Sequence, residues 1–372
     1  MIQNGAYFDK FLKILEIVKK FQKVLCSDVL FVQIGDSFMK WVNIVFGACV
    51  AMNFLFGAEK TLEFHQLPKA ELHLHLGGSF PKEYLFSIAT TAEREELTEA
   101  LDLVAQRIDY HAAFRVFALI AQIVNSEEKL QKGVSWLCHS LMTDGVCYVE
   151  IRTGLKNLGQ GTDEYLKAVL KGIEEAQLPQ LKANVVLSLQ RNSPLAMVQE
   201  TIDLALKYRD QGVIGLDISG NAAMGQIAPI IPDLMRAKKE GLAFTVHMGE
   251  VPGETDQMLL LTQLEPKRIG HGVYLSDKAK EWILKHQVPL EGCLTSSVLV
   301  KMIDDYREHP GLEFFRLGHP IVFCTDDPLL FSTTLSQELL HAHASCGLSS
   351  EEIRLLVERS FNYSLENQLP LK

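Results

Sequence analysis

The sequence predicts an α/β protein built as a TIM-type (β/α)8 barrel. Three observations lead to this fold: eight short β-rich runs, helix-sized segments between them, and polar residues where the runs end. We expect the barrel to span residues 62–372, with extra helices between its first two strands and an N-terminal helical extension over residues 1–61. A doubly wound open sheet is the alternative, which is disfavoured because no glycine-rich phosphate loop follows the first run.

The eight predicted strands are short runs rich in apolar and β-branched residues, bounded by turn-forming positions. They cover residues 71–76, 147–153, 184–189, 213–218, 243–247, 268–272, 288–293 and 321–325. Segments between them, such as 163–175 and 197–208, repeat apolar residues every three or four positions, which is typical of amphipathic helices. The stretch between the first two strands is too long for one helix. We expect several there, at 80–88, 93–106, 110–124 and 127–142.

The N-terminal extension differs in character from the barrel. Residues 8–25 alternate apolar and lysine positions like an amphipathic helix, and residues 41–58 carry no charge at all. If translation starts at Met39, the segment 39–58 resembles a secretory signal. It is marginal in length for a membrane span, and an ordinary packed helix is an equal alternative.

Composition narrows the class of protein. With 47% hydrophobic residues, 22% charged residues and a formal charge of −10, the chain is folded and lacks the basic balance of a general nucleic-acid binder. The H-x-E and P-C-x-x-C pattern of cytidine-type deaminases is absent as well. The seven cysteines show no C-x-x-C spacing, so we expect neither a disulfide framework nor a cysteine zinc site. Reduced cysteines favour a cytoplasmic location, with export or membrane anchoring through residues 39–58 as the alternative.

Chemically active side chains gather at the predicted strand ends, the face on which barrel enzymes hold their active sites. His73 and His75 stand two apart in the first strand, so both imidazoles face the barrel interior. Five further groups lie at or just beyond the ends of other strands: His247, Glu250, His271, Asp326 and Asp327. Three histidines with one aspartate are a typical zinc set, and zinc lowers the pKa of water to roughly 7. The alternative is that these polar groups only satisfy one another in the barrel core.

Six segments carry a more specific resemblance. PKAELHLHLGGS, GLDISGN, HMGE, RIGHG, CLTSS and CTDDP occur in this order, and together they resemble the adenosine deaminase family of metal-dependent hydrolases. GLDISGNAAMGQ, LEGCLTSSV and TTLSQE are similar to its N6-methyl-AMP deaminase branch. The resemblance spans about residues 67–338 and implies a zinc TIM barrel. It also implies removal of the 6-amino or N6-methylamino group of an adenine nucleoside or nucleotide, giving an inosine-type product.

The resemblance also implies roles for single residues. One zinc ion would be held by four ligands, of which His75 would also border the substrate: His73, His75, His247 and Asp326. Glu250 would give a proton to purine N1, and His271 would orient the attacking hydroxide. Asp327 would hydrogen-bond N7, and the backbone N–H of Gly220 would reach N3. On residue type alone, Gly220 is equally well a loop glycine.

Two departures from the family pattern concern the 5′ end of the substrate. Adenosine deaminases usually carry an aspartate two residues after the second histidine, whereas this chain has Gly77. Without a carboxylate at this position, a substrate phosphate would not be repelled. After the second strand, Thr153 and Lys156 stand in place of a Ser-Thr-Pro-Arg-like phosphate loop, so a bidentate arginine is missing. Both nucleoside and nucleotide substrates therefore stay open.

Three functions remain as hypotheses. The first is a zinc purine deaminase, the second an amidohydrolase-type enzyme acting on another purine-derived or non-purine substrate. The third is a non-catalytic adenine-nucleoside-binding protein, which would require a broken site although every catalytic position is present. The expected partner is a small purine nucleoside or nucleotide and no nucleic acid, with membrane contact only through a retained N-terminal apolar segment.

Overall fold

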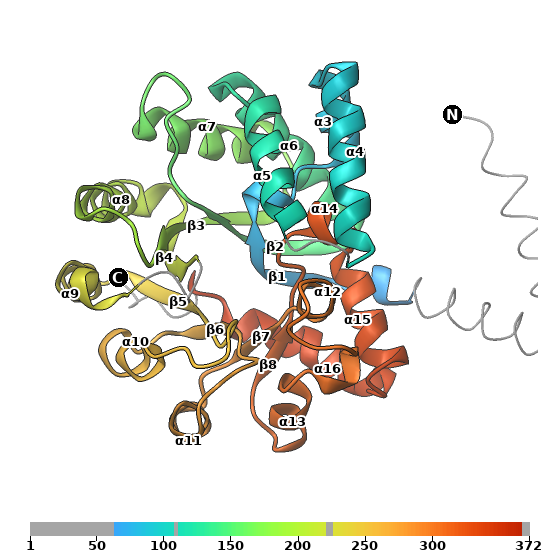
Figure 1. The fold of residues 1–372 in the computed structure, drawn as a ribbon, viewed down its shortest axis with the longest axis vertical. Coiled ribbons are helices and arrows are strands. Elements are labelled where there is room, and N and C mark those ends of the chain that lie inside the picture. Colours follow the sequence, from blue (N-terminus) through green and yellow to red (C-terminus); the bar gives the residue numbers. More distant parts are fainter. Residues whose placement is uncertain (1–62, 108–110, 221–225, 367–372) are drawn as a thin grey trace, which may run out of the picture. The chain divides into compact units, whose positions relative to one another are not determined.

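Eight parallel strands follow one another around a ring in the computed structural model, in the order of the chain (Figure 1). The structure describes residues 63–107, 111–220 and 226–366; the predicted extension over 1–61 and its candidate signal at 39–58 lie outside them. The strands are β1 (Lys69–His75), β2 (Val146–Thr153), β3 (Lys182–Gln190), β4 (Val213–Ser219), β5 (Ala243–Met248), β6 (Arg268–His271), β7 (Leu290–Gly292) and β8 (Ile321–Phe323). All eight predicted strands are therefore present.

The ring closes between β1 and β8 just beyond the last residue of β8. Leu74 forms a parallel bridge with Asp326, the His75 N–H donates to the Asp326 carbonyl at 2.8 Å, and the Asp326 N–H donates to the His73 carbonyl at 2.8 Å. The TIM-type barrel is thus confirmed, and the open doubly wound sheet is wrong because neighbouring strands are sequential throughout.

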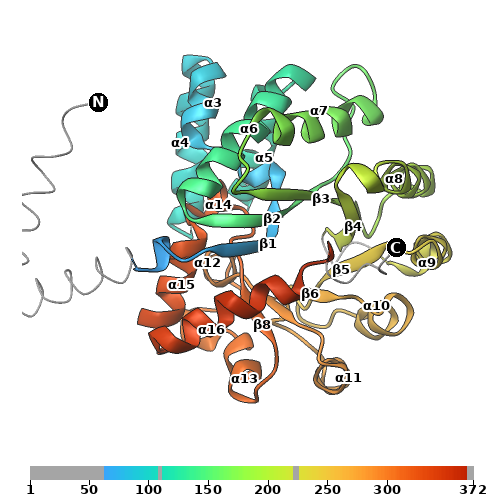
Figure 2. The ribbon, with the colours of Figure 1, turned by 180° about the vertical axis from the view of Figure 1, so that it is seen from behind.

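Helices surround the ring of strands on its outer side (Figures 1 and 2). Those that follow β2 to β6 are α7 (Thr162–Glu175), α8 (Leu195–Lys207), α9 (Ile231–Lys239), α10 (Gln257–Leu264) and α11 (Asp277–His286). Those that follow β7 and β8 are α12 (Leu294–Leu299), α13 (Gly311–Arg316), α14 (Pro328–Phe331), α15 (Leu335–Ala344) and α16 (Ser350–Ser360). In the part of the chain that the structure describes, no helix is both long and apolar enough to cross a membrane.

The predicted insertion between the first two strands consists of four helices. They are α3 (Lys82–Ile88), α4 (Thr91–Ala105), α5 (His111–Ile123) and α6 (Glu127–Thr143). Local sequence sets where two of them begin: Thr90 and Glu93 form a reciprocal capping box at α4, and the Ser126 side chain caps α6. Helix α5 contacts the turn η1 (Leu76–Gly78) that follows β1, so the insertion reaches the carboxyl end of the first strand.

The last two strands are shorter than predicted. β7 covers three residues instead of 288–293, and β8 covers three instead of 321–325. Cys293 already caps α12, and Asp326 has a left-handed backbone with φ of +67°, so neither residue can extend its strand. Both strands therefore give way to irregular backbone at the end of the barrel where the polar residues gather.

Candidate metal centre and active site

Four side chains from β1, β5 and the turn after β8 converge on one point in the barrel. The Nε2 atoms of His73 and His75 are 3.2 Å apart, and those of His75 and His247 are 2.9 Å apart. The Asp326 Oδ1 atom lies 3.4 Å from His73 Nε2 and 3.5 Å from His75 Nε2. The structure thus brings together the four residues predicted as metal ligands, with one donor atom each available to a single ion.

The donor set fits a metal ion because carboxylates occupy the far nitrogens of two rings. His73 Nδ1 lies 2.8 Å from Glu291 Oε2, and His247 Nδ1 lies 3.0 Å from Asp217 Oδ1. A carboxylate accepts only, so each Nδ1 carries the hydrogen and each Nε2 directs a lone pair toward the common centre. Lone pairs repel one another, and a cation between them converts this repulsion into attraction. Three nitrogens and one oxygen suit zinc.

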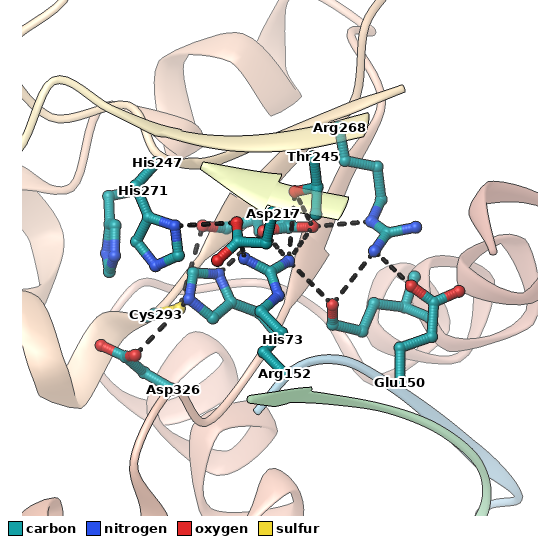
Figure 3. A network of polar contacts seen from close by, with 12 residues as sticks. His73, Glu150, Arg152, Asp217, Thr245, His247, Arg268, His271, Cys293 and Asp326 are labelled. Carbon is teal, nitrogen blue, oxygen red and sulfur yellow. Dashed lines mark hydrogen bonds and ion pairs between the residues drawn. The ribbon is translucent and has the colours of Figure 1, made fainter. Parts of the chain in front are cut away.

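Two buried arginines hold the carboxylates behind the histidines (Figure 3). The Arg152 Nη2 atom donates to both oxygens of Glu291 at 2.7 Å, and its Nη1 donates to Asp217 at 3.3 Å. Arg268 Nε donates to Glu291 Oε1 at 2.6 Å. Burial alone would raise the pKa of Glu291, but these two guanidinium groups hold it well below its usual range. Glu291 therefore stays ionised and orients His73.

Asp326 is positioned by its neighbours and by a strained backbone. The Ser296 hydroxyl at the start of α12 donates to Asp326 Oδ2 at 2.6 Å, which leaves Oδ1 facing the histidines. Although burial would raise the pKa of Asp326, the surrounding imidazoles, His73 foremost, hold it well below its usual range. Asp326 and His271 both have left-handed backbones, with φ of +67° and +63°. Non-glycine residues rarely adopt this conformation, and such strain concentrates at functional sites.

Glu250 and His271 lie beside the metal-ligand group. His271 Nε2 is 3.8 Å from Glu250 Oε1, and the imidazoles of His271 and His73 have centroids 5.0 Å apart. Burial raises the pKa of Glu250 and lowers the pKa of His271 to about 4. The upward shift at Glu250 is the direction that a proton donor near neutral pH requires, and His271 beside it is a neutral imidazole at that pH. Cys293 also lies close to His271 and Asp326, and its thiol is buried.

Asp327 follows Asp326 and caps α14, with its carboxyl packed on the backbone of Gly78. A Cβ atom added to Gly78 would lie 2.5 Å from both Cβ and Cγ of Asp327, so this position accepts only glycine without a shift. Burial and the adjacent Asp326 carboxylate raise the pKa of Asp327 well above its usual range. A protonated Asp327 is a hydrogen-bond donor, as the predicted contact with purine N7 requires.

The residues predicted to contact the rest of the substrate lie on three loops. Gly220 follows β4 with φ of +85°, a conformation that glycine adopts freely. Gly77 lies in η1, where an added Cβ would meet only Phe117 at 3.8 Å. Thr153 ends β2, and its hydroxyl is bonded to the Tyr165 hydroxyl at 2.7 Å.

Lys156 is exposed in the loop after β2. It has no hydrogen-bond or ion-pair partner among the described residues, and desolvation by the protein around it lowers its pKa. It is therefore the available cation of this loop, whereas the hydroxyl of Thr153 is already engaged.

Several residues that shape the site were not predicted from the sequence. Asp217, Glu291, Arg152, Arg268 and Ser296 all contact a metal-ligand side chain or its carboxylate partner. A signal for Asp217 and Glu291 was present, because each carboxylate stands within an otherwise apolar strand and a buried charge needs a partner. Nothing in the spacing indicated which histidine each one would contact.

The adenosine deaminase family profile matches residues 68–368 of this chain. A zebrafish (Danio rerio) N6-methyl-AMP deaminase is 32% identical over 330 residues, which cover 84% of this chain and 94% of that protein. An adenosine deaminase of Clostridium botulinum (strain Okra / Type B1) is 29% identical over 317 residues, covering 81% and 95%. The crystal structure of Arabidopsis ADAL complexed with IMP superposes with a TM-score of 0.73 at 28% identity, covering 81% and 93%.

Proposed function

The chain belongs to the adenosine deaminase family, and from this premise we propose that it is a zinc-dependent hydrolytic deaminase of adenine nucleotides. The reaction adds water at C6 of the purine and releases ammonia or, from an N6-methylated base, methylamine, leaving an inosine-type product. The observation that supports this most strongly is the convergence of His73, His75, His247 and Asp326 beside Glu250 and His271. A non-catalytic binding protein is disfavoured because the complete set of catalytic groups is present.

The metal and the protein have separate tasks in this proposal. His73, His75, His247 and Asp326 would hold a zinc ion, which would supply the Lewis acidity that makes water nucleophilic at neutral pH. Glu250 delivers a proton to purine N1 as negative charge develops on the ring, and burial raises the pKa of its carboxyl, the direction that a proton donor near neutral pH requires. Neutral His271, 3.8 Å from Glu250, orients the attacking oxygen by a hydrogen bond. Asp327, whose pKa is raised by burial, holds purine N7, and the Gly220 N–H holds N3.

A 5′-monophosphate is the substituent that the surroundings of η1 favour. Gly77 places no carboxylate there, and Lys156, which has no polar partner among the described residues, offers a cation on the loop after β2. The N6-methyl-AMP deaminase of zebrafish and the IMP complex of Arabidopsis ADAL support a nucleotide ligand. The similarity to a bacterial adenosine deaminase makes the nucleoside the second candidate. An amidohydrolase-type reaction on a different substrate is the remaining alternative.

The experiment is a substrate panel with metal analysis on the same preparation. Adenosine, AMP, N6-methyladenosine and N6-methyl-AMP are offered to the wild type and to Glu250→Gln, with exposed Glu281→Gln on α11 as the matched control. We expect nucleotide turnover, zinc at about one per chain, and a loss of about 10²-fold or more in Glu250→Gln with zinc retained. Full activity in Glu250→Gln would contradict its role, and no turnover of any adenine compound would favour the alternative substrate.

Gly77→Asp tests the 5′ preference separately. The position has room for a side chain, and a carboxylate there would repel a phosphate. We expect kcat/KM for AMP to fall at least about tenfold relative to adenosine. An unchanged ratio would show that Gly77 does not border the 5′ group.

A further inference from the structure

A buried ion pair braces the turn that carries Glu250. We propose that Arg191 and Glu254 are positioning residues that align the Glu250 carboxyl for proton transfer. This inference rests on the proposed function, because it concerns the residue assigned to protonate the purine. Neither residue belongs to the metal-ligand group, and neither is explained by the contacts of His73 or Asp326.

Arg191 lies in the loop after β3, yet its side chain is almost entirely buried, with 1% exposed. Its backbone N–H donates to the Ser219 carbonyl at 3.1 Å, which ties this loop to the end of β4. Its Nη2 atom donates to the His247 carbonyl at 2.7 Å and to Glu254 Oε1 at 2.6 Å. One nitrogen therefore joins both ends of the segment 247–254.

Glu254 holds the middle of the same segment. Its Oε2 accepts a hydrogen bond from the N–H of Gly249, the residue directly before Glu250, at 2.5 Å. Gly249 has φ of +72°, and its carbonyl accepts from the Tyr274 N–H at 2.7 Å. Both backbone polar groups of Gly249, its N–H and its C=O, are therefore hydrogen-bonded, and they fix the chain on the N-terminal side of Glu250.

Glu250 has little else to orient it. Among the described residues its carboxylate makes no hydrogen bond, and its one polar contact is His271 Nε2 at 3.8 Å. About a quarter of its side chain is exposed. The position of this carboxyl therefore follows from the backbone that carries it, and that backbone is held by Arg191 and Glu254. A displacement of about 1 Å can lower a catalytic rate by about 10²-fold.

Two substitutions break the brace with little change in volume. In Glu254→Gln an amide nitrogen, which only donates, replaces one carboxylate oxygen, so the side chain can keep its hydrogen bond with either Gly249 or Arg191 but not both. Arg191→Met removes the guanidinium that donates to Glu254 and to the His247 carbonyl. Arg191→Lys is the conservative variant, because the wild-type contacts all come from a single nitrogen. Arg236→Met is the matched control, since it removes an exposed arginine that pairs with Asp203 on the outer helices.

The measurements are kcat, KM, zinc content and hydrogen–deuterium exchange of the backbone amides in 247–254. For Arg191→Met and Glu254→Gln we expect kcat to fall about 10- to 100-fold, with KM within about threefold and zinc content unchanged. Exchange in 247–254 should be faster in both variants. Arg191→Lys should recover most of the lost kcat, and Arg236→Met should match the wild type.

Three results would overturn the inference. They are a kcat within about twofold of the wild type in both variants, a rise in KM alone, or a loss of zinc that accounts for the lost activity. Loss of zinc would mean that Arg191 acts on the ligand His247 instead of Glu250. If the wild type deaminates no adenine compound, the proposed function fails, and the exchange rates still decide whether the pair braces the turn.

Discussion

At the scale of single residues, the site depends on metal-ligand histidines and on the carboxylates that orient them. The metal-ligand set was predictable because H-x-H in a strand places both rings on one face, and strand ends meet at one end of a barrel. The sequence did not show which carboxylate orients which histidine, because each carboxylate lies on a strand distant in sequence from its histidine. Glu291 contacts His73 across 218 residues of chain.

Gly78 and Gly77 form a natural pair of test positions. Gly78→Ala would force its new methyl group into Asp327, whereas Gly77→Ala meets only ordinary contact with Phe117. We expect Gly78→Ala to lower kcat/KM about 10- to 100-fold and Gly77→Ala to change it by less than about threefold. Steady-state kinetics with metal content measured alongside checks this. Equal effects of the two changes would show that Asp327 does not depend on Gly78.

At the scale of secondary-structure elements, the strands and the four inserted helices follow from local patterns. The predicted starts at residues 93 and 127 lie within about two residues of the observed starts of α4 and α6, which are capped by Thr90 and Ser126. The ends of β7 and β8 were not predictable, because α12 begins directly after Cys293 and Asp326 has a left-handed backbone where the ring closes. Local strand propensity indicates neither feature.

The contact between α15 and α12 carries a buried carboxyl with a measurable pH signature. Glu338 on α15 accepts from the Thr295 N–H at 3.1 Å and from the Thr333 hydroxyl at 2.7 Å, and burial raises its pKa to about 7. Between the unfolded pKa near 4.5 and this value, the folded chain holds a proton that the unfolded chain lacks. This group's stabilisation is therefore complete below about pH 4.5 and is lost as the pH rises through 7.

Glu338→Gln should remove that part of the pH dependence. Comparing urea unfolding at pH 5 to 8, we expect the free energy of unfolding of the wild type to fall by up to about 3 kcal/mol more than that of the variant. The comparison uses slopes, so a general loss of stability in Glu338→Gln does not affect it. Exposed Glu281→Gln should follow the wild-type slope. Parallel curves for Glu338→Gln and wild type would contradict the assignment.

At the scale of the whole molecule, one buried arginine joins distant parts of the chain. Arg268 on β6 donates to Glu150 at 2.5 Å and Glu291 at 2.6 Å, to the Leu72 carbonyl of β1, and to the Tyr363 carbonyl near the C-terminus. Glu150 in turn accepts from the Leu365 N–H at 2.7 Å. The overall barrel was predictable from eight strands, but this internal network was not, because it depends on how the inward side chains of four strands meet.

Arg268→Met should be far more costly than the loss of a surface arginine. It leaves the buried Glu150 without its arginine and Glu291 with one arginine, Arg152, instead of two. We expect the free energy of unfolding to fall by about 3–5 kcal/mol. Arg236→Met, which breaks an exposed pair with Asp203, should cost less than about 1 kcal/mol. Chemical denaturation of both variants under the same conditions checks the difference. Similar losses in the two would show that the interior pairs add no stability beyond that of a surface pair.

The closure of the ring at Leu74 and Asp326 has a consequence for the order in which the protein is made. A ribosome releases His73 and His75 early, and His247 well before the last strand. Asp326 both completes the ligand set and bridges β8 to β1. Until Asp326 is synthesised, a nascent chain therefore has three of the four ligands and lacks the bridge from β8 to β1. The complete ligand set and the bridge from β8 to β1 depend on the same late residue, so a chain terminated before Asp326 has neither.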